Sequence, residues 1–195
     1  KDNPKYASVD GVVFSKDMKQ ILKKFSTLII LVVLVVIFSV ASPNFLRVNN
    51  LLNVLRQVAV IGILTAGMTY VIISGAMDLT VGAYLGLSGV ALAQLISAGV
   101  PVPAAVILTI VLMTVIGIVT GALIVGLNVS AIVITLGMMT VVRGLAYIFS
   151  GGLPVYDIPD LIVFLGQGYV AGIPVPVIIM VIIVVIAGLI LKYSY

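Results

Sequence analysis

The chain has 195 residues, of which 63% are hydrophobic and only 8% charged, whereas a soluble domain is about 45–50% apolar and about 25% charged. Its net charge of +4 comes mainly from lysines ahead of the first apolar run, which is typical of a cytoplasmic anchor and not of a nucleic-acid-binding surface. Cysteine and histidine are absent, which excludes disulfides, thiol or Ser-His nucleophiles, and nearly every transition-metal site.

Six apolar runs follow one another along the chain. A helix needs roughly 20 apolar residues to cross a bilayer, and because these runs are apolar around their whole circumference, length identifies them better than periodicity. The sequence therefore predicts an all-α fold, a polytopic transmembrane helix bundle with about six membrane segments. The runs are 25–41, 58–74, 82–98, 104–127, 131–149 and 175–191.

Residues 1–24 carry most of the charge and are expected to form a cytoplasmic N-terminal segment. The first apolar run, with "SVAS" at 39–42, also has features of a cleaved signal peptide. The long polar leader and the later runs favour a retained anchor. An external turn, "SPNFLRVNN", is then expected to lead into a short helix at 51–57.

Alternating crossings place "AGVPVP" (98–103) outside, and "AGIPVP" (171–176) repeats it ahead of another apolar helix. Chance similarity in a Val/Pro-rich chain is the alternative. If both copies lie outside, residues 161–170 do not cross the membrane, because ten residues span only about 15 Å as a helix. A re-entrant or interfacial piece is expected there, and Lys192 then lies in the cytoplasm.

The stretch "SGAMDLTVG" (74–82) places an aspartate between two apolar runs. Gly75 is expected to end the preceding helix, and Asp78 or Thr80 to cap the following one. Two interpretations stay open: a capped cytoplasmic turn, or a turn inside the bundle that lines a polar pathway. The glycine pairs 82/86 and 117/121 favour close helix packing, although glycine is also simply common in membrane helices.

A second stretch, "NVSAIVITLGMMTVVRGLAYIFSGGLP" (128–154), interrupts an apolar helix with Asn128, Thr135 and Gly137. The loop at 150–160 that follows combines glycines, prolines and two carboxylates. It is either a solvated turn or an acidic surface for an external partner.

Two of these stretches resemble one family. "VIISGAMDLTVGAYLGLSG" (71–89) is similar to its Gly-Ile-Asp-Leu-Ser-Val-Gly turn, with Ala76-Met77 for Gly-Ile and Thr80 for Ser. "NVSAIVITLGMMTVVRGLAYIFSGGLPV" (128–155) is similar to its Pro-Phe-Ile-Val-Thr-Leu-Gly and Arg-Gly-Leu-Ala segment, with Ser130-Ala131 for Pro-Phe. Over residues 44–195 the chain resembles the membrane permease subunits of ATP-binding-cassette importers for ribose, other monosaccharides and autoinducer-2.

The resemblance implies a permease subunit that moves ribose or a similar monosaccharide across the bacterial cytoplasmic (inner) membrane, with autoinducer-2 import as an alternative. It implies three partners: a second permease copy or paralogue, an extracytoplasmic solute-binding protein, and an ATP-binding-cassette ATPase. The sequence has no G-x-x-x-x-G-K-[ST] loop, so ATP is expected to bind the partner, and this chain to be no enzyme and to need no cofactor or metal. The family's ATPase-docking loop would follow Tyr195, so residues 25–195 are expected to be a truncated permease domain.

In this interpretation, affinity comes mainly from the binding protein and the pathway is only weakly polar. The residues expected near the pathway are Asp78, Thr80, Asn128 and Thr135 as polar groups and Gly75, Gly82 and Gly137 for close backbone approach. The residues expected to contact the binding protein are Gly151, Gly152, Pro154, Tyr156 and Asp157.

Three other functions are compatible with a polytopic membrane chain. An ion-coupled secondary transporter needs ionisable residues within the membrane, and only Asp78 is a candidate. An intramembrane aspartyl protease needs two facing carboxylates, and only Asp78 is near the membrane interior. A pure assembly protein would associate with no ATPase. The sequence leaves open the solute, a homodimer or heterodimer, and the depth of Asp78.

Overall fold

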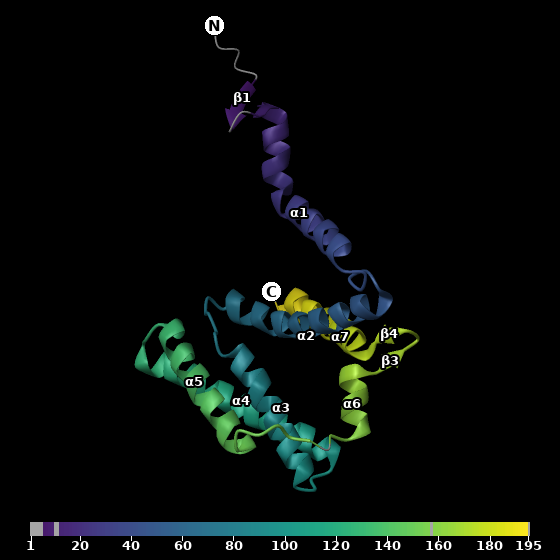
Figure 1. The fold of residues 1–195 in the computed structure, drawn as a ribbon. Helices are drawn as coiled ribbons and strands as arrows, with labels where there is room; N and C mark the ends of the chain where they lie inside the picture. The colour runs from purple at the N-terminus through teal and green to yellow at the C-terminus, as the bar shows by residue number, and fades with distance from the viewer. Residues whose placement is uncertain (1–5, 10–11, 157, 195) are drawn as a thin grey trace. The chain divides into compact units, whose positions relative to one another are not determined.

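The computed structural model describes residues 6–9, 12–156 and 158–194, with side chains from residue 25 onward, and it confirms a mostly helical protein (Figure 1). Two short antiparallel strand pairs accompany the helices. In chain order the elements are β1 (Tyr6–Val9), β2 (Val12–Ser15), α1 (Lys16–Ala41), α2 (Val48–Ile73), α3 (Val81–Ser97), α4 (Val102–Leu127), α5 (Ala131–Ser150), α6 (Asp160–Gln167), β3 (Tyr169–Val170), β4 (Ile173–Pro174) and α7 (Val175–Ser194).

Each expected membrane segment corresponds to an apolar helix. Within the described residues, α2, α4, α5 and α7 are long and apolar enough to cross a membrane. The described apolar part of α1, Phe25–Ala41, and helix α3, Val81–Ser97, are shorter apolar segments. The expected bundle of about six membrane segments is therefore confirmed at the level of helix type and position.

One boundary differs from the expectation. The separate short helix expected at 51–57 is wrong, because α2 runs without interruption from Val48 to Ile73. The sequence changes there only in polarity, at Arg56 and Gln57, and both residues are good helix formers. Without a glycine or proline the backbone has no reason to break at that point.

The chain divides into two compact units, Lys1–Val54 and Leu55–Tyr195, which are described separately. In the first unit the corner after α1 is closed by aromatic and amide contacts. The rings of Phe38 and Phe45 stack with centroids 5.7 Å apart, and the Asn50 side-chain amide donates to the Phe45 carbonyl at 2.8 Å. These contacts fix the turn from which α2 begins.

In the second unit, α3 packs against both α4 and α5 (Figure 1). The core of this packing is Ala83, Leu87 and Val142, which are buried. On α3 this core thus consists of Ala83 and Leu87. Close packing at the glycine pairs is not found among the described residues, because a Cβ added at Gly82, Gly86, Gly117 or Gly121 would meet no atom within 4 Å.

The two copies of the Ala-Gly-Val/Ile-Pro-Val-Pro repeat share the conformation of their glycine and the start of the next helix, but differ at the alanine, where Ala171 has φ 51° and Ala98 φ −78°. Gly99 and Gly172 have φ of 85° and 80°, which glycine adopts without the steric cost of a Cβ. The helices α4 and α7 then begin at the valine between the two prolines, Val102 and Val175. A proline within the first turn is tolerated because its missing N–H would have no intrahelical partner there.

Between the two repeats lies α6, whose eight residues span about 12 Å. As expected, this segment is too short to cross a bilayer. It ends at Gly168, whose backbone N–H donates to the Phe164 carbonyl at 2.7 Å, and it packs directly against α7. The position of Gly168 leaves no room for a side chain, since an added Cβ would meet the Phe164 ring and lie 2.5 Å from the Phe164 carbonyl oxygen.

We therefore expect Gly168→Ala to lower the free energy of unfolding by about 1–3 kcal/mol, the usual cost of overpacking. Gly166→Ala is the matched control in the same segment, because a Cβ there would have no neighbour within 4 Å. Alanine also favours the helix at that position. Thermal unfolding of both variants in detergent is the measurement, and equal midpoints would contradict the prediction.

Candidate functional site

The turn between α2 and α3 satisfies its own backbone groups. The N–H of Gly75 donates to the carbonyl of Ile72 at 3.0 Å, and that of Ala76 to the carbonyl of Val71 at 3.2 Å. With Gly75 at φ 80°, this is the Schellman pattern, in which a left-handed residue ends a helix and pairs its last carbonyls. The expectation that Gly75 ends the preceding helix is confirmed.

Asp78 organises the rest of this turn. Its Oδ1 accepts a hydrogen bond from the backbone N–H of Thr80 at 2.8 Å and a second, very short one from the Thr80 hydroxyl. Thr80 is fully buried, and its carbonyl accepts the N–H of Tyr84 at 2.9 Å in the first turn of α3. The expectation that Asp78 or Thr80 caps the free N–H groups of α3 is not met, since Thr80 makes no side-chain cap bond and Asp78 forms an Asx turn one step earlier.

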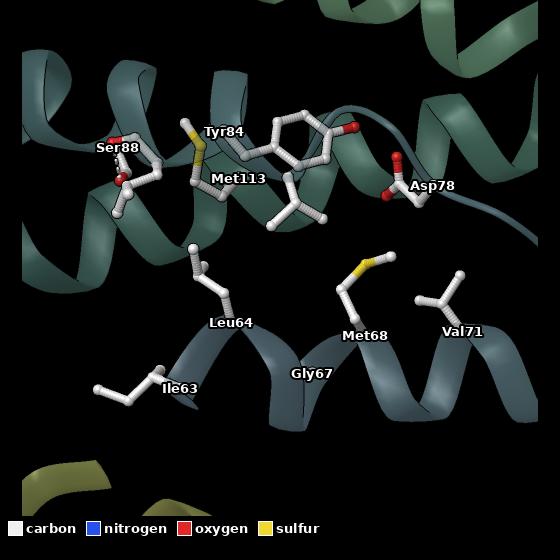
Figure 2. Close-up of a pocket in the computed structure, with 11 residues that line it drawn as sticks. Ile63, Leu64, Gly67, Met68, Val71, Asp78, Tyr84, Ser88 and Met113 are labelled. Atoms are coloured by element: carbon white, nitrogen blue, oxygen red, sulfur yellow. Dashed lines mark hydrogen bonds between the residues drawn. The ribbon is translucent and has the colours of Figure 1, made fainter. Parts of the chain in front are cut away.

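Two adjoining cavities open beside this turn, and Val71, Asp78 and Tyr84 line both. The larger, about 310 Å³, lies between α2 on one side and α3 with Met113 of α4 on the other (Figure 2). The smaller, about 200 Å³, reaches Thr120 and Gly121 of α4 and Thr135 of α5. The larger volume is at the lower end of the range of about 300–1,000 Å³ that is usual for small-molecule sites.

Figure 2 shows Leu64, Met68 and Val71 extending from α2 toward the opposite wall, which carries Asp78, Tyr84 and Ser88. The polar groups thus come from the α2–α3 turn and from one face of α3. Tyr84 and Ser88 are four residues apart, the spacing that places side chains on the same helix face. One wall of the larger cavity is apolar and the other carries oxygen atoms.

The hydroxyl groups around the cavities already act as hydrogen-bond donors to other atoms of the protein. Thr120 donates to the Ile116 carbonyl at 2.8 Å, so in its 2.8 Å contact with Tyr84 the tyrosine is the donor. Ser88 donates to the Leu85 carbonyl at 2.8 Å and Thr135 to the Ile132 carbonyl at 3.2 Å. With the Asp78 carboxylate, these side chains therefore offer the cavities lone pairs and almost no free donors.

The structure brings together three of the seven residues predicted near a pathway. Asp78 and Thr135 line the smaller cavity, and Thr80 lies behind Asp78 as its hydrogen-bond partner. The other four lie elsewhere and line neither cavity: Gly75 in the turn, Gly82 near the start of α3, Asn128 at the left-handed end of α4, and Gly137 on an exposed face of α5.

A close backbone approach is also not found at the three predicted glycines. A Cβ added at Gly75, Gly82 or Gly137 would meet no atom within 4 Å among the described residues. The glycines that line the cavities are Gly67 in the larger one and Gly117 and Gly121 in the smaller one, where the absence of a side chain leaves the space open.

Sequence reasoning did not single out Tyr84, Ser88 and Thr120 as candidate site residues. A signal for the first two was present, since polar residues four apart on an otherwise apolar helix mark one face. Thr120 carried no such signal, because its role depends on Tyr84 reaching across from another helix.

The residues predicted to contact a binding protein follow α5. Gly151 ends this helix at φ 62°, and Gly152, at φ 73°, lies against the Tyr147 ring. Pro154 and Tyr156 are exposed, as a contact surface requires. Asp157, the fifth predicted contact, lies outside the described residues.

Comparison with known proteins gives a consistent result. The family model described as branched-chain amino acid transport system / permease component matches residues 50–194. The ribose import permease protein RbsC of Haemophilus influenzae is 38% identical over 168 residues, 84% of this chain and 52% of that protein. The RbsC of Bacillus subtilis is 40% identical over 173 residues, 88% of this chain and 54% of that protein.

A third relative, the autoinducer 2 import system permease protein LsrD of Escherichia coli, is 35% identical over 156 residues, 77% of this chain and 47% of that protein. The chain thus spans about half the length of the curated relatives it matches. No solved structure matches it significantly.

The Asx turn leads to a prediction about Asp78. Asp78→Ala removes the acceptor of the buried Thr80 N–H and hydroxyl, and we expect a loss of about 1–3 kcal/mol in unfolding free energy. Asp78→Asn keeps an oxygen at Oδ1 and should stay within about 1 kcal/mol of the parent protein. Thermal unfolding in detergent compares the two, and an Asn variant as unstable as the Ala variant would refute the role of Oδ1.

Proposed function

The chain belongs to the family of permease components of branched-chain amino acid transport systems, and from this premise we propose that it is the membrane permease subunit of an ATP-binding-cassette importer. It moves ribose or a similar monosaccharide across the bacterial cytoplasmic membrane. Its partners are an ATPase subunit that binds and hydrolyses ATP, an extracytoplasmic solute-binding protein, and a second permease copy or paralogue. The proposal is supported by relatives that are named ribose import permeases and are similar to this chain over most of its length.

The observation that carries the choice of solute is the hydrogen-bonding character of the cavities. Asp78, Tyr84 and Ser88 offer acceptor oxygens to the larger cavity. The hydroxyl groups of Tyr84 and Ser88 already donate hydrogen bonds to other protein atoms. A solute that is rich in O–H donors pairs with such a wall, whereas a solute that brings mainly acceptors leaves both sides unpaired. A monosaccharide is uncharged and presents a hydroxyl on most of its carbons.

An amino acid fits this site poorly, although the family is named for amino acid transport. Its carboxylate would need a cation or several free N–H or O–H donors. Among the described residues no lysine or arginine lines either cavity. Burying an unpaired carboxylate is costly, so we assign the site to an uncharged polyol.

Transport proceeds by alternating access of the cavities beside Asp78 to the two sides of the membrane. The segment 1–24 lies in the cytoplasm, because its lysines precede the first membrane segment. Residues 25–195 belong to the permease domain, and Lys192, in the last turn of α7, is on the cytoplasmic side. The exposed residues Gly151, Gly152, Pro154 and Tyr156, with Asp157, face the binding protein. The other predicted pathway residues remain candidates: Gly75, Gly82, Asn128 and Gly137.

Two alternatives have a specific observation behind them. Import of autoinducer-2 by the same machinery is favoured by the similarity to LsrD. An ion-coupled secondary transporter is favoured by the Asp78 carboxylate beside the cavities, since intramembrane carboxylates often bind the coupling ion.

Uptake of labelled ribose by cells that express the intact permease with its partners tests the proposal. We expect uptake to require a functional ATPase and to continue when ionophores collapse the ion gradients. Unlabelled ribose should compete for this uptake and leucine should not, because the cavities pair with a solute rich in O–H donors. Uptake that stops with the gradients would favour the secondary transporter, and cells that take up autoinducer-2 but no labelled ribose would favour the other alternative.

The cavity itself is tested by filling it. Gly121→Val adds a side chain to the smaller cavity at a position where a Cβ would meet no atom within 4 Å, and we expect roughly tenfold slower uptake, equivalent to about 1.4 kcal/mol. Gly126→Val is the matched control on α4, because Gly126 also has an open Cβ position but lines neither cavity. If both variants transport alike at equal expression, the cavity is not on the pathway.

A further inference from the structure

Arg56 is the only charged residue of α2. An arginine in an apolar helix is costly unless it pairs or reaches water. Its Nη2 donates to the backbone carbonyl of Gln167 at 3.1 Å and to the Tyr169 hydroxyl at 2.6 Å. The guanidinium carbon also lies 5.2 Å from the centre of the Tyr169 ring, within cation–π range. These contacts with Gln167 and Tyr169 are here called the Arg56 latch.

The latch holds a tightly built turn. Gln167 ends α6 and Tyr169 begins β3, so Arg56 binds the chain on both sides of Gly168. The Gly168 carbonyl accepts the N–H of Val175, the first residue of α7, at 3.0 Å. Hydrogen bonds thus connect the start of α7 to the end of α6 across the turn.

The same helix that carries Arg56 also lines the solute cavity. Ile63, Leu64, Met68 and Val71 of α2 form one wall of the larger cavity (Figure 2). They lie about 10–22 Å along the helix from Arg56, at 1.5 Å per residue. Further along, the Tyr70 hydroxyl donates to the Ala187 carbonyl of α7 at 2.6 Å. One continuous helix therefore joins the α6–α7 turn to the cavity wall.

We propose that Arg56 is a positioning residue that couples the α6–α7 turn to the solute cavity through α2. This inference rests on the proposed function, in which α6 and the turn lie on the extracytoplasmic side, next in the chain to the residues that face the binding protein. When the loaded binding protein docks there and displaces the turn, the latch moves α2 and so the wall opposite Asp78. The latch must differ in free energy between the two permease conformations, because only a differential contact shifts their equilibrium.

The chemistry of the latch requires arginine. A guanidinium is planar, and one such group donates to two oxygens while it lies over an aromatic ring. A lysine ammonium is a point charge on a flexible stem and does not reproduce this geometry. Arg56→Lys therefore keeps the charge and loses the latch, whereas Tyr169→Phe removes only the hydroxyl acceptor and retains the ring.

The experiment uses the intact permease with its ATPase partner in lipid vesicles. ATP hydrolysis is measured alone and with ribose-loaded binding protein, for the parent protein, R56K, Y169F and the double variant. R47K is the matched control, since Arg47 is an exposed arginine just before α2. We expect R56K to keep basal hydrolysis and lose roughly fivefold or more of the stimulation, a change within the usual range of coupling between sites. Y169F should lose less, and the double variant no more than R56K alone, because the two residues act as one unit.

Unchanged stimulation in R56K overturns the latch. Equal loss of basal and stimulated hydrolysis, an equal loss in R47K, or additive effects in the double variant also overturns it, since each indicates a structural or general charge effect. If R56K does not assemble with the ATPase, the stimulation of ATP hydrolysis in Y169F tests the proposal. Stimulation in Y169F equal to that of the parent protein then refutes it. A parent complex that the loaded binding protein fails to stimulate contradicts the proposed function, whereas a stimulated parent with unaffected variants contradicts the latch alone.

Discussion

The unwound stretch between α2 and α3 has to satisfy its backbone polar groups within the protein wherever water does not reach it. Gly75 solves this at the end of α2 through its left-handed conformation, and Asp78 solves it before α3 by accepting the Thr80 N–H and hydroxyl. Oδ1 of Asp78 therefore holds the turn through hydrogen bonds, and the same side chain also lines both cavities. The two interpretations of this turn, a structural turn and part of a pathway, are thus compatible.

The character of the cavities follows from how membrane helices treat hydroxyl groups. A Ser or Thr side chain in an apolar helix donates to a carbonyl of the preceding turn, as Ser88, Thr120 and Thr135 do here. Each such residue then presents only lone pairs to its surroundings. Several of them around one space, with a carboxylate, produce a wall that pairs with a donor-rich neutral solute and leaves the carboxylate of an amino acid without a partner. The polarity is weak, which suits a pathway that must release its solute.

Helix α2 links the features of the second unit on which the proposals rest. It carries Arg56 near the α6–α7 turn, supplies the apolar wall of the larger cavity, and is joined to α7 through Tyr70. A helix that is continuous over these positions transmits displacement along its axis better than two segments with a break. Its continuity is therefore a functional matter, and the expected boundary at 57/58 missed it.

The sequence by itself determined the helical class, the positions of the apolar segments, the short α6 and the helix end at Gly75, because length, hydrophobicity and glycine conformation are local properties. It predicted seven residues near one pathway, of which the structure brings Asp78, Thr80 and Thr135 together. The contacts between helices came from the tertiary structure alone: Tyr84 meets Thr120, Arg56 reaches Gln167 and Tyr169, and Ala83 and Leu87 of α3 pack with Val142 of α5. These contacts join residues 36 to 113 positions apart in the chain, and an all-round apolar helix does not encode in its sequence which face meets which neighbour.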